Sequence, residues 1–413
     1  MDARPAPPAR PARRRAPRPA LLLALLLAAC AAPPVPPPKP PKPPKPPQSA
    51  PPAPPPAVPG ATAALTGAGL NLQPARFADL PGWAADDFSG VWSAWQRDCS
   101  AGLPQLAAAC SASGAVAPND AAAQRAFFEQ WFQPWQATAS TGAETGLVTG
   151  YYEPVLHGSR TRAWPYVVPV YGLPADLVDR SGADDGVTRG RVVWRDGRKD
   201  VLPYWSRAQI SADPQAQAVL DRNVVVWLDS AVEALFLQVQ GSGLVQLPDG
   251  ETLRLSYAGD NGWPYKSVGR WLLDQGELRG TVTMQIIRAW ARMHPERVQQ
   301  MLDANPRVVF FRAAVLDHPE RGPTGAMGVP LTPLRSVAVD KRQLALGTPL
   351  WLSTTVAGQP FAHLVFAQDV GGAITGSLRA DLFFGTGEAA GDAAGRMQSP
   401  GRMWVLLPRG SSR

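Results

Sequence analysis

The sequence has few cysteines and histidines, which limits the metal sites that it can form. Of its 413 residues, three are Cys and four are His. The histidines do not show HExxH spacing, none has a Cys nearby, and no CxxC pair is present. A zinc site is therefore not expected, and we predict no metal and no other cofactor.

The part of the sequence with globular composition also lacks a basic charge, although the formal net charge is +7. Residues 1–47 alone carry a net charge of +8, so the rest of the chain sums to −1. A domain that binds nucleic acid should itself be basic, so no nucleic-acid partner is expected. A GxSxG motif is absent, and the GxGxxA match at 385–390 has no βαβ context.

Long hydrophobic runs are missing as well. The longest apolar run at the N-terminus, Ala20–Ala29, is too short to cross a bilayer, which needs about 20 apolar residues. It follows four arginines and ends in Leu-Ala-Ala-Cys at residues 27–30, which resembles a lipobox. We predict a lipoprotein signal peptide at 1–30, with Cys30 lipid-modified; the alternative is an ordinary signal with an incidental Cys. Ala31 fits retention at the outer membrane, with a lipid-anchored protein on its periplasmic face.

What the chain has in excess is proline. Seventeen of its 46 prolines fall between Pro33 and Pro59. Such a segment is extended, at about 3 Å per residue, and cannot form a packed core. We predict that residues 31–61 are a stiff tether, an arrangement that suits a large, fixed substrate.

The two remaining cysteines, Cys99 and Cys110, leave two alternatives open. In an oxidising periplasm they could form a disulfide, or they could be two free buried thiols.

From about residue 62 the pattern predicts a mainly β protein with a few helices. Helical spacing of apolar residues is seen at 121–137 and at 282–302, the second interrupted or kinked near Pro295. Strands are expected at Val192–Trp194, Val201–Tyr204, Leu235–Gln240, Thr252–Tyr257, Ser336–Val339, Leu350–Ser353, His363–Ala367, Ala380–Phe384 and Met403–Leu407. Strands this short, with frequent turns, favour small β-barrels in two β-rich domains.

Three aspartates in the last hundred residues are candidates for chemistry. Asp340 and Asp369 lie at the ends of strand-like segments, and Asp381 lies inside another. Burial of a carboxyl group raises its pKa and favours the protonated form, which is the form that protonates a leaving glycosidic oxygen. Taken singly, each aspartate could instead bind the amides of a turn.

Five motifs in order make the sequence similar to a known family. They are Thr149–Pro154 (TGYYEP), Gln238–Gly243 (QVQGSG), Tyr257–Gly262 (YAGDNG), Gly328–Thr332 (GVPLT) and the three-aspartate segment. Together they resemble the membrane-bound lytic murein transglycosylase A family, from about residue 145 to 407. The resemblance implies a double-psi β-barrel catalytic domain made of residues 62–152 and 316–413. It also implies an inserted, β-barrel-like domain at 153–315, with the substrate groove between the two.

The resemblance further implies an enzyme that cleaves the β-1,4 bond between N-acetylmuramic acid and N-acetylglucosamine of peptidoglycan without water. The products carry 1,6-anhydromuramoyl ends, and one carboxyl group acts first as acid and then as base. Carried over by motif, that group is Asp381. Asp369 would be a supporting carboxylate, and Asp340 is the third aspartate of the motif.

Candidate substrate contacts come from two of the motifs. Tyr151 and Tyr152 are candidates for sugar-ring contacts, and Gln238, Gln240 and Ser242 are candidates for hydrogen bonds to the sugar. The expected partners are peptidoglycan glycan strands, outer-membrane lipid and other cell-wall enzymes. Two rival hypotheses remain: a two-carboxylate peptidoglycan hydrolase, and a non-catalytic lipoprotein that binds peptidoglycan.

Overall fold

The computed structural model of the protein describes residues 69–409. The predicted signal peptide, Cys30 and the tether at 31–61 lie outside the described residues. All described residues belong to one of the two units of the chain, Ala53–Arg413. Among them, no helix combines the length and the apolar character needed to cross a membrane.

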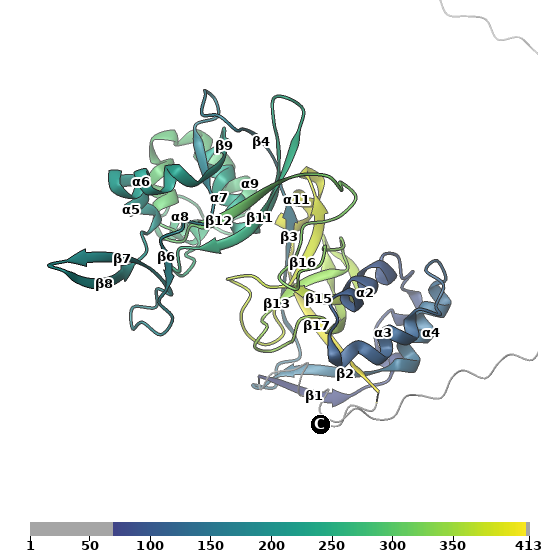
Figure 1. Ribbon diagram of the computed structural model, residues 1–413. Coiled ribbons are helices and arrows are strands. Elements are labelled where there is room, and N and C mark those ends of the chain that lie inside the picture. The colour runs from purple at the N-terminus through teal and green to yellow at the C-terminus, as the bar shows by residue number, and fades with distance from the viewer. Residues whose placement is uncertain (1–68, 410–413) are drawn as a thin grey trace, which may run out of the picture. The chain divides into compact units, whose positions relative to one another are not determined.

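The largest sheet has eight strands, in the order β1-β2-β17-β14-β15-β13-β16-β3 (Figure 1). Because β17 also pairs with β3, the last six strands close into a barrel. The pairs β3–β16 and β13–β15 are parallel and the others antiparallel, which is consistent with a double-psi connectivity. The strands are β1 (Leu70–Pro74), β2 (Phe132–Ala139), β3 (Gly146–Glu153), β13 (Ser336–Val339), β14 (Pro349–Val356), β15 (Gln359–Asp369), β16 (Ala380–Thr386) and β17 (Gln398–Pro408). The five strands predicted in the C-terminal third are all confirmed.

The barrel has one apolar layer inside and another outside. Since side chains alternate along a strand, Leu382 and Val405 point into the barrel, whereas Trp351 and Phe366 point outward. The outward residues pack against three helices, which lie beside these strands in Figure 1. These helices are α2 (Val91–Ser100), α3 (Ala107–Ser113) and α4 (Ala121–Trp131). Burying each large aromatic side chain contributes about 1.5–3 kcal/mol, so the helices stabilise the barrel wall.

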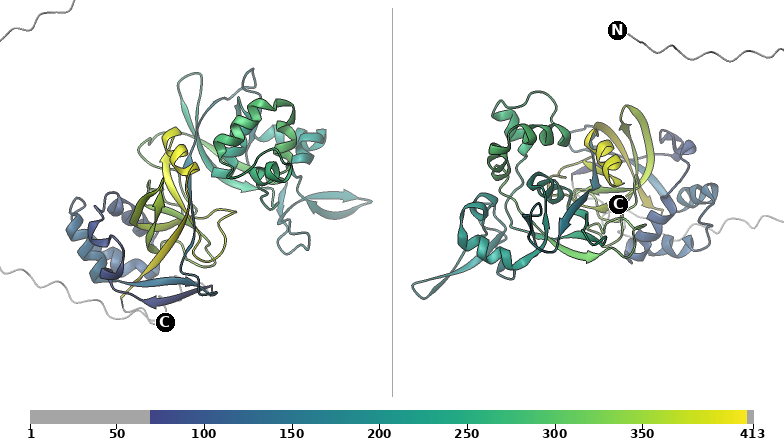
Figure 2. Two further views of the ribbon diagram at one scale, coloured as in Figure 1. Left: turned by 180° about the vertical axis from the view of Figure 1, so that it is seen from behind. Right: turned by 90° about the horizontal axis from the view of Figure 1, so that it is seen from above.

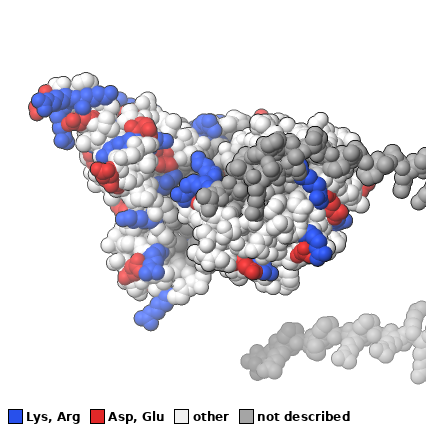
Figure 3. Space-filling model, turned by 90° about the horizontal axis from the view of Figure 1, so that it is seen from below, with Lys and Arg blue, Asp and Glu red and all other residues white. Residues whose placement is uncertain are grey.

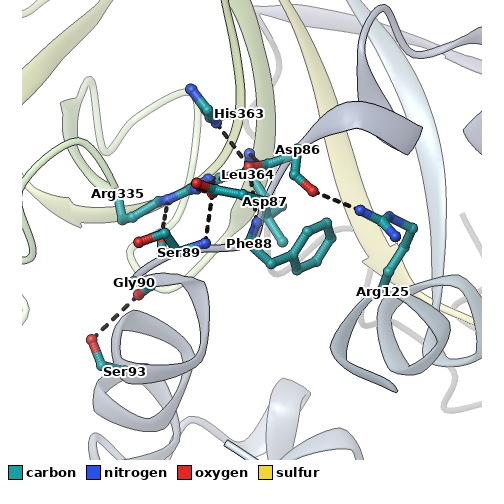
Figure 4. Close-up of polar contacts among 10 residues, drawn as sticks. All are labelled: Asp86, Asp87, Phe88, Ser89, Gly90, Ser93, Arg125, Arg335, His363 and Leu364. Carbon is teal, nitrogen blue, oxygen red and sulfur yellow. Dashed lines mark hydrogen bonds and ion pairs between the residues drawn. The ribbon is translucent and has the colours of Figure 1, made fainter. Parts of the chain in front are cut away.

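Two cross-links hold this helical segment. Cys99 of α2 and Cys110 of α3 form a disulfide, with Cα atoms 5.4 Å apart. Before α2, the buried Asp86 accepts hydrogen bonds from both terminal nitrogens of Arg335, at 2.9 and 3.0 Å (Figure 4). Nδ1 of His363 lies 2.9 Å from the same carboxylate. Burial opposes ionisation of Asp86, but the hydrogen bonds from His363 and Arg335 hold its pKa well below the usual range.

Between β3 and β13 the chain forms a second β-rich region. It contains a six-stranded sheet in the order β12-β11-β10-β4-β9-β5 and a three-stranded sheet in the order β6-β7-β8. The strands are β4 (Val155–Ser159), β5 (Val168–Tyr171), β6 (Leu177–Asp179), β7 (Arg189–Arg195), β8 (Arg198–Pro203), β9 (Val224–Leu228), β10 (Ser242–Gln246), β11 (Thr252–Asp260) and β12 (Val309–Val315). A mainly β fold with a barrel and an inserted β domain is thus confirmed, although the inserted sheet is open. The domain boundaries after residues 152 and 315 remain our proposal.

Helices flank the inserted sheet. They are α5 (Arg207–Ala212), α6 (Pro214–Leu220), α7 (Ala231–Gln240), α8 (Val268–Asp274), α9 (Met284–Met293) and α10 (Val298–Asp303). One further helix, α11 (Glu388–Gly395), follows β16 of the barrel. Short 3₁₀ turns are η1 (Phe77–Asp79), η2 (Trp83–Ala85), η3 (Pro104–Leu106), η4 (Asp221–Asn223) and η5 (Pro295–Arg297).

A buried ion pair joins the insert to the barrel. The Glu153 side chain, at the end of β3, is fully buried and pairs with Arg254 of β11 at 2.9 Å. Thr386 of β16 donates a second hydrogen bond to the same carboxylate. Because breaking such a pair leaves a buried charge without a partner, it stabilises the contact between β3 and β11.

The structure corrects two of the sequence predictions. The strand predicted at Leu235–Gln240 is wrong: the segment is the end of α7, capped by the Ser230 hydroxyl and ended by Gly241 in the left-handed region. The helix predicted at 121–137 ends at Trp131, because the next residues, including Pro134, form β2. The break predicted near Pro295 is confirmed between α9 and α10.

The β7–β8 hairpin projects from the insert in both views of Figure 2. Its strands pair from Gly190–Pro203 to Arg195–Arg198 at the tip. Arg195, Arg198 and Lys199 are exposed there, and Lys and Arg side chains gather on the projection at the upper left of Figure 3.

Candidate active site

Two of the three candidate aspartates lie in one row across the barrel wall. Ala338 of β13 pairs with Asp369 of β15 on one side and with Asp381 of β16 on the other. Asp381 pairs in turn with Thr149 of β3. Because adjacent strands are about 4.8 Å apart, the two aspartate positions are about 10 Å apart along the sheet. Ala338 is the only residue between them and has a short side chain, so it leaves open space above the wall.

Asp381 points away from the barrel interior, since its neighbour Leu382 lies in the core. The Thr149 hydroxyl donates to Oδ1 of Asp381 at 2.5 Å, and Arg379 donates to the Thr149 oxygen at 2.8 Å. Arginine can only donate, so the Thr149 proton is directed at Asp381. Within residues 69–409, Oδ2 of Asp381 has no hydrogen-bond partner.

The environment of Asp381 favours a carboxyl group that titrates near neutrality. Burial raises the pKa of Asp381 to about 6, against the opposing effects of the Thr149 hydrogen bond and the Arg379 charge. The charge of Asp369 raises this pKa further. A group with such a pKa can give up and take back a proton at physiological pH.

Asp369 is held by more partners than Asp381. Its Oδ1 accepts from the backbone N–H groups of Ala326 and Val370, both at 2.9 Å. Its Oδ2 accepts from the Tyr151 hydroxyl at 2.8 Å. Burial raises the pKa of Asp369, and these hydrogen bonds counteract part of the rise. The group is therefore fixed in place and orients Tyr151, whose ring contacts Phe383.

Asp340 has a different environment, at the end of β13. Arg342 binds both of its oxygens, at 2.7 and 2.9 Å, and the backbone N–H of Gly376 donates at 2.7 Å. The side-chain hydrogen bonds from Arg342, together with the backbone hydrogen bond from Gly376, hold the pKa of Asp340 well below its usual range. Asp340 is therefore an ionised carboxylate that organises a turn.

A cavity of about 860 Å³ lies over this row and extends to the inserted sheet. Its volume is within the range of ligand-binding pockets. Of the residues predicted from the sequence, those that line it are Asp340, Asp369, Asp381, Tyr151, Gln238, Gln240 and Ser242. Tyr152 does not line it: strand alternation turns its ring toward α11, where it packs against Gly391, and its hydroxyl meets Arg288.

The side chains of both cavity-lining glutamines form hydrogen bonds within the protein. Oε1 of Gln238 accepts from Arg207 at 2.7 Å and from the Val309 backbone at 3.2 Å. Oε1 of Gln240 accepts from the Tyr152 backbone N–H at 3.0 Å. The Gln240 amide nitrogen also donates to Met284 Sδ at 3.9 Å. The Gln238 amide N–H groups and the second N–H of Gln240 are therefore the donors left for a ligand.

Sequence reasoning did not single out several residues at this site. Tyr257 is about half exposed in the cavity wall and donates to Asp260 at 2.6 Å, and Arg307 pairs with the same carboxylate at 2.7 Å. Both Tyr257 and Asp260 belong to the YAGDNG motif, which was a usable signal. Thr149 begins the TGYYEP motif, whereas nothing in the sequence pointed to Arg379. Within residues 69–409, no group of three or more His, Cys, Asp or Glu side chains is placed to hold a metal ion.

The chain matches two family descriptions. Residues 147–312 match the MltA specific insert domain, and residues 335–407 match the 3D domain. The membrane-bound lytic murein transglycosylase A of Escherichia coli K12 is 34% identical over 282 residues, which cover 66% of this chain and 68% of that protein.

Solved structures agree with these matches. MltA from Neisseria gonorrhoeae superposes with a TM-score of 0.72 and 32% identity, covering 84% of this chain and 95% of that one. The Escherichia coli MltA structure with bound chitohexaose gives a TM-score of 0.63 and 28% identity, covering 83% and 96%. The protein described here belongs to the membrane-bound lytic murein transglycosylase A family.

Proposed function

We propose that the protein cleaves the β-1,4 bond between N-acetylmuramic acid and N-acetylglucosamine in peptidoglycan without water, with Asp381 as acid and then as base. The observation that carries this proposal is the position of Asp381 in the wall of the large cavity, with a pKa of about 6 and one oxygen free. Family membership supports the reaction class. The chitohexaose bound by the Escherichia coli relative supports a glycan strand as the cavity's occupant.

The chemistry needs only one protonatable group. The Asp381 carboxyl proton moves to the glycosidic oxygen as the bond from that oxygen to the muramoyl C1 breaks, and the N-acetylglucosamine hydroxyl leaves. The Asp381 carboxylate then takes the proton of the muramoyl C6 hydroxyl as O6 bonds to C1. The 1,6-anhydro ring closes, and Asp381 ends protonated, as it began.

Asp369 serves as a supporting group in this proposal. It accepts two backbone hydrogen bonds and one from Tyr151, so it is poorly placed to move a proton repeatedly. Its negative charge, when present, raises the pKa of Asp381. Asp369 also fixes the ring of Tyr151 in the cavity wall, where that ring would contact a sugar.

Substitution of Asp381 tests the assignment. Asp381→Asn keeps the shape and the Thr149 hydrogen-bond site but cannot cycle a proton, so turnover of purified sacculi should fall at least a thousandfold. Asp392→Asn, on the neighbouring helix α11, is the matched control and should keep activity. Release of muropeptides at a near-normal rate by Asp381→Asn would remove Asp381 from the acid/base role.

The mass of the products separates this reaction from hydrolysis. Anhydromuramoyl products are lighter by one water than hydrolytic products, and they lack a reducing end. Products with reducing ends would favour the two-carboxylate hydrolase, with Asp369 activating a water. Binding of sacculi without any release, unchanged in Asp381→Asn, would favour the non-catalytic lipoprotein.

We also propose that a lipid on Cys30 attaches the protein to the periplasmic face of the outer membrane, with the Pro-rich segment as a spacer. The lipobox-like sequence before Cys30 and the membrane-bound name of the relatives support this proposal. Cys30→Ala should move the protein from the outer-membrane fraction to the soluble periplasmic fraction. An unchanged distribution would argue for another means of attachment.

A further inference from the structure

The cavity that contains Asp381 carries four cationic side chains, and two of them are already neutralised. Arg307 pairs with Asp260 at 2.7 Å, and Arg342 pairs with Asp340 at 2.7 Å. Arg312 and Lys341 also line the cavity, and both are exposed. Within residues 69–409, the side chains of Arg312 and Lys341 have no ion pair or hydrogen bond.

Arg312 and Lys341 come from the two sheets that bound the cavity. Arg312 of β12 lies in one register row with Ser256 of β11 and Ser242 of β10, and all three residues line the cavity. Lys341 follows β13, three residues after Ala338, which separates the two aspartates. A ligand lying along the cavity would therefore meet one free cation from the insert and another from the barrel.

The acidic groups of the cavity do not offset these cations. Asp340 and Asp260 are bound to their own arginines. Asp381 is bound by Thr149 and Asp369 by Tyr151, and within residues 69–409 neither carboxyl group forms an ion pair with Arg312 or Lys341. The cavity therefore keeps two cations available for an anionic ligand, while the remaining polar contacts suit neutral hydroxyl and amide groups.

We propose that Arg312 and Lys341 bind a carboxylate on the side arm of the N-acetylmuramoyl residue and so select muramoyl-containing strands over uncharged glycan. This inference rests on the proposed function. N-acetylmuramic acid differs from N-acetylglucosamine by a lactyl ether, whose carboxyl group is free in stem-free strands and is joined to a peptide in stem-bearing ones. In both cases the arm carries carboxylate, either on the lactyl group or on the peptide. An arginine and a lysine are the usual protein partners for such a group.

Binding measurements in the full-length Asp381→Asn background test the proposal without turnover. The three ligands are chitohexaose, which is uncharged, a stem-free peptidoglycan hexasaccharide, and the same hexasaccharide with its peptides. Arg312→Gln and Lys341→Gln should each weaken binding of the carboxylate-bearing ligands about three- to tenfold. Chitohexaose affinity should stay within twofold, which also shows that the variants are folded. Arg195→Gln, on the β7–β8 hairpin outside the cavity, is the matched control and should change nothing.

The pattern of losses identifies the source of the carboxylate. A loss with the stem-free ligand alone assigns the lactyl carboxylate, and a loss with the stem-bearing ligand alone assigns the peptide carboxylates. A loss with both shows that the two cations bind whichever carboxylate the side arm carries. Equal losses for all three ligands, or no loss for any, would overturn the proposal. The product masses of the wild-type enzyme judge the proposed reaction separately, so failure of one conclusion can be told from failure of the other.

Discussion

Replacing Thr149 with Val should raise the pKa of the Asp381 carboxyl group. Val keeps the shape of the side chain but removes the hydroxyl that donates to Asp381 at 2.5 Å. A hydrogen bond to a charged group contributes about 1.5–3 kcal/mol, and 1.36 kcal/mol corresponds to one pKa unit. Loss of this bond should therefore raise the pKa from about 6 by about one to two units.

The pH dependence of kcat/KM on purified glycan strands measures this change. The first step requires protonated Asp381, so activity falls as pH rises through its pKa. In Thr149→Val the alkaline limb should move about one to two units toward higher pH, at a reduced maximal rate. Thr355→Val, at an exposed hydroxyl on β14, should leave the limb in place. An alkaline limb that stays unchanged, or moves toward lower pH, would refute the assignment of this limb to Asp381.

The remaining predictions concern stability. Asp86→Asn removes the buried charge that pairs with Arg335 and leaves that arginine only the longer ion pair with the exposed Asp87, at 3.3 Å. This should lower the free energy of unfolding at pH 7 by about 3–5 kcal/mol, whereas Asp87→Asn, at an exposed side chain, should change it little. Because the pKa of Asp86 is lowered on folding, the difference measured by urea unfolding should shrink below about pH 4. Replacing Cys99 and Cys110 together by Ala opens a short loop and should cost about 3 kcal/mol, whereas an unchanged urea midpoint would contradict a structural role. Asp381→Asn should stabilise the protein at pH 8 by up to about 3 kcal/mol, because the pKa of Asp381 is raised to about 6 on folding. That gain should vanish below about pH 4, and a gain that persists there would show that burial of the charge is not its cause.

Most barrel strands could be predicted correctly from the sequence because the two faces of each strand have different surroundings, which sets the pattern of side chains along it. In the C-terminal third, each predicted strand has one face in the barrel core. The other face of β14, β15 and β17 packs against helices, whereas that of β13 and β16 faces the cavity, so the apolar residues cluster in short runs. The strand predicted at 235–240 was wrong because a run of only six residues, with apolar and polar side chains mixed, fits a strand as well as a helix. Two signals could have decided it: Ser230 at an N-cap position, followed by Glu233, and Gly241 at the C-terminus.

Candidate acids could be found from the sequence, whereas their differing partners could not. Asp381 and Asp369 look alike as carboxylates in apolar strands. What separates them is strand register: Thr149 is 232 residues away in sequence but directly beside Asp381 in the sheet. The role of Arg379 becomes apparent only from its hydrogen bond to Thr149, which directs the Thr149 hydroxyl at Asp381. Pairing between strands so distant depends on the closed barrel as a whole and leaves no local signal.

The row of four residues also explains why one fold can hold two carboxyl groups in unlike roles. Asp369 and Asp381 flank the same residue, Ala338, and face the same cavity. However, β15 ends at Asp369, so the chain turns there and supplies the Val370 backbone N–H to its side chain, beside the Ala326 N–H from a separate segment. Asp381 lies near the start of β16, between two paired strands, where the backbone N–H groups are used in the sheet and one side-chain hydroxyl is the partner. Asp369, at a strand end, is therefore held by several hydrogen-bond donors. Asp381, inside a strand, keeps one oxygen free and has a raised pKa. A carboxyl group in that state is the one suited to move a proton.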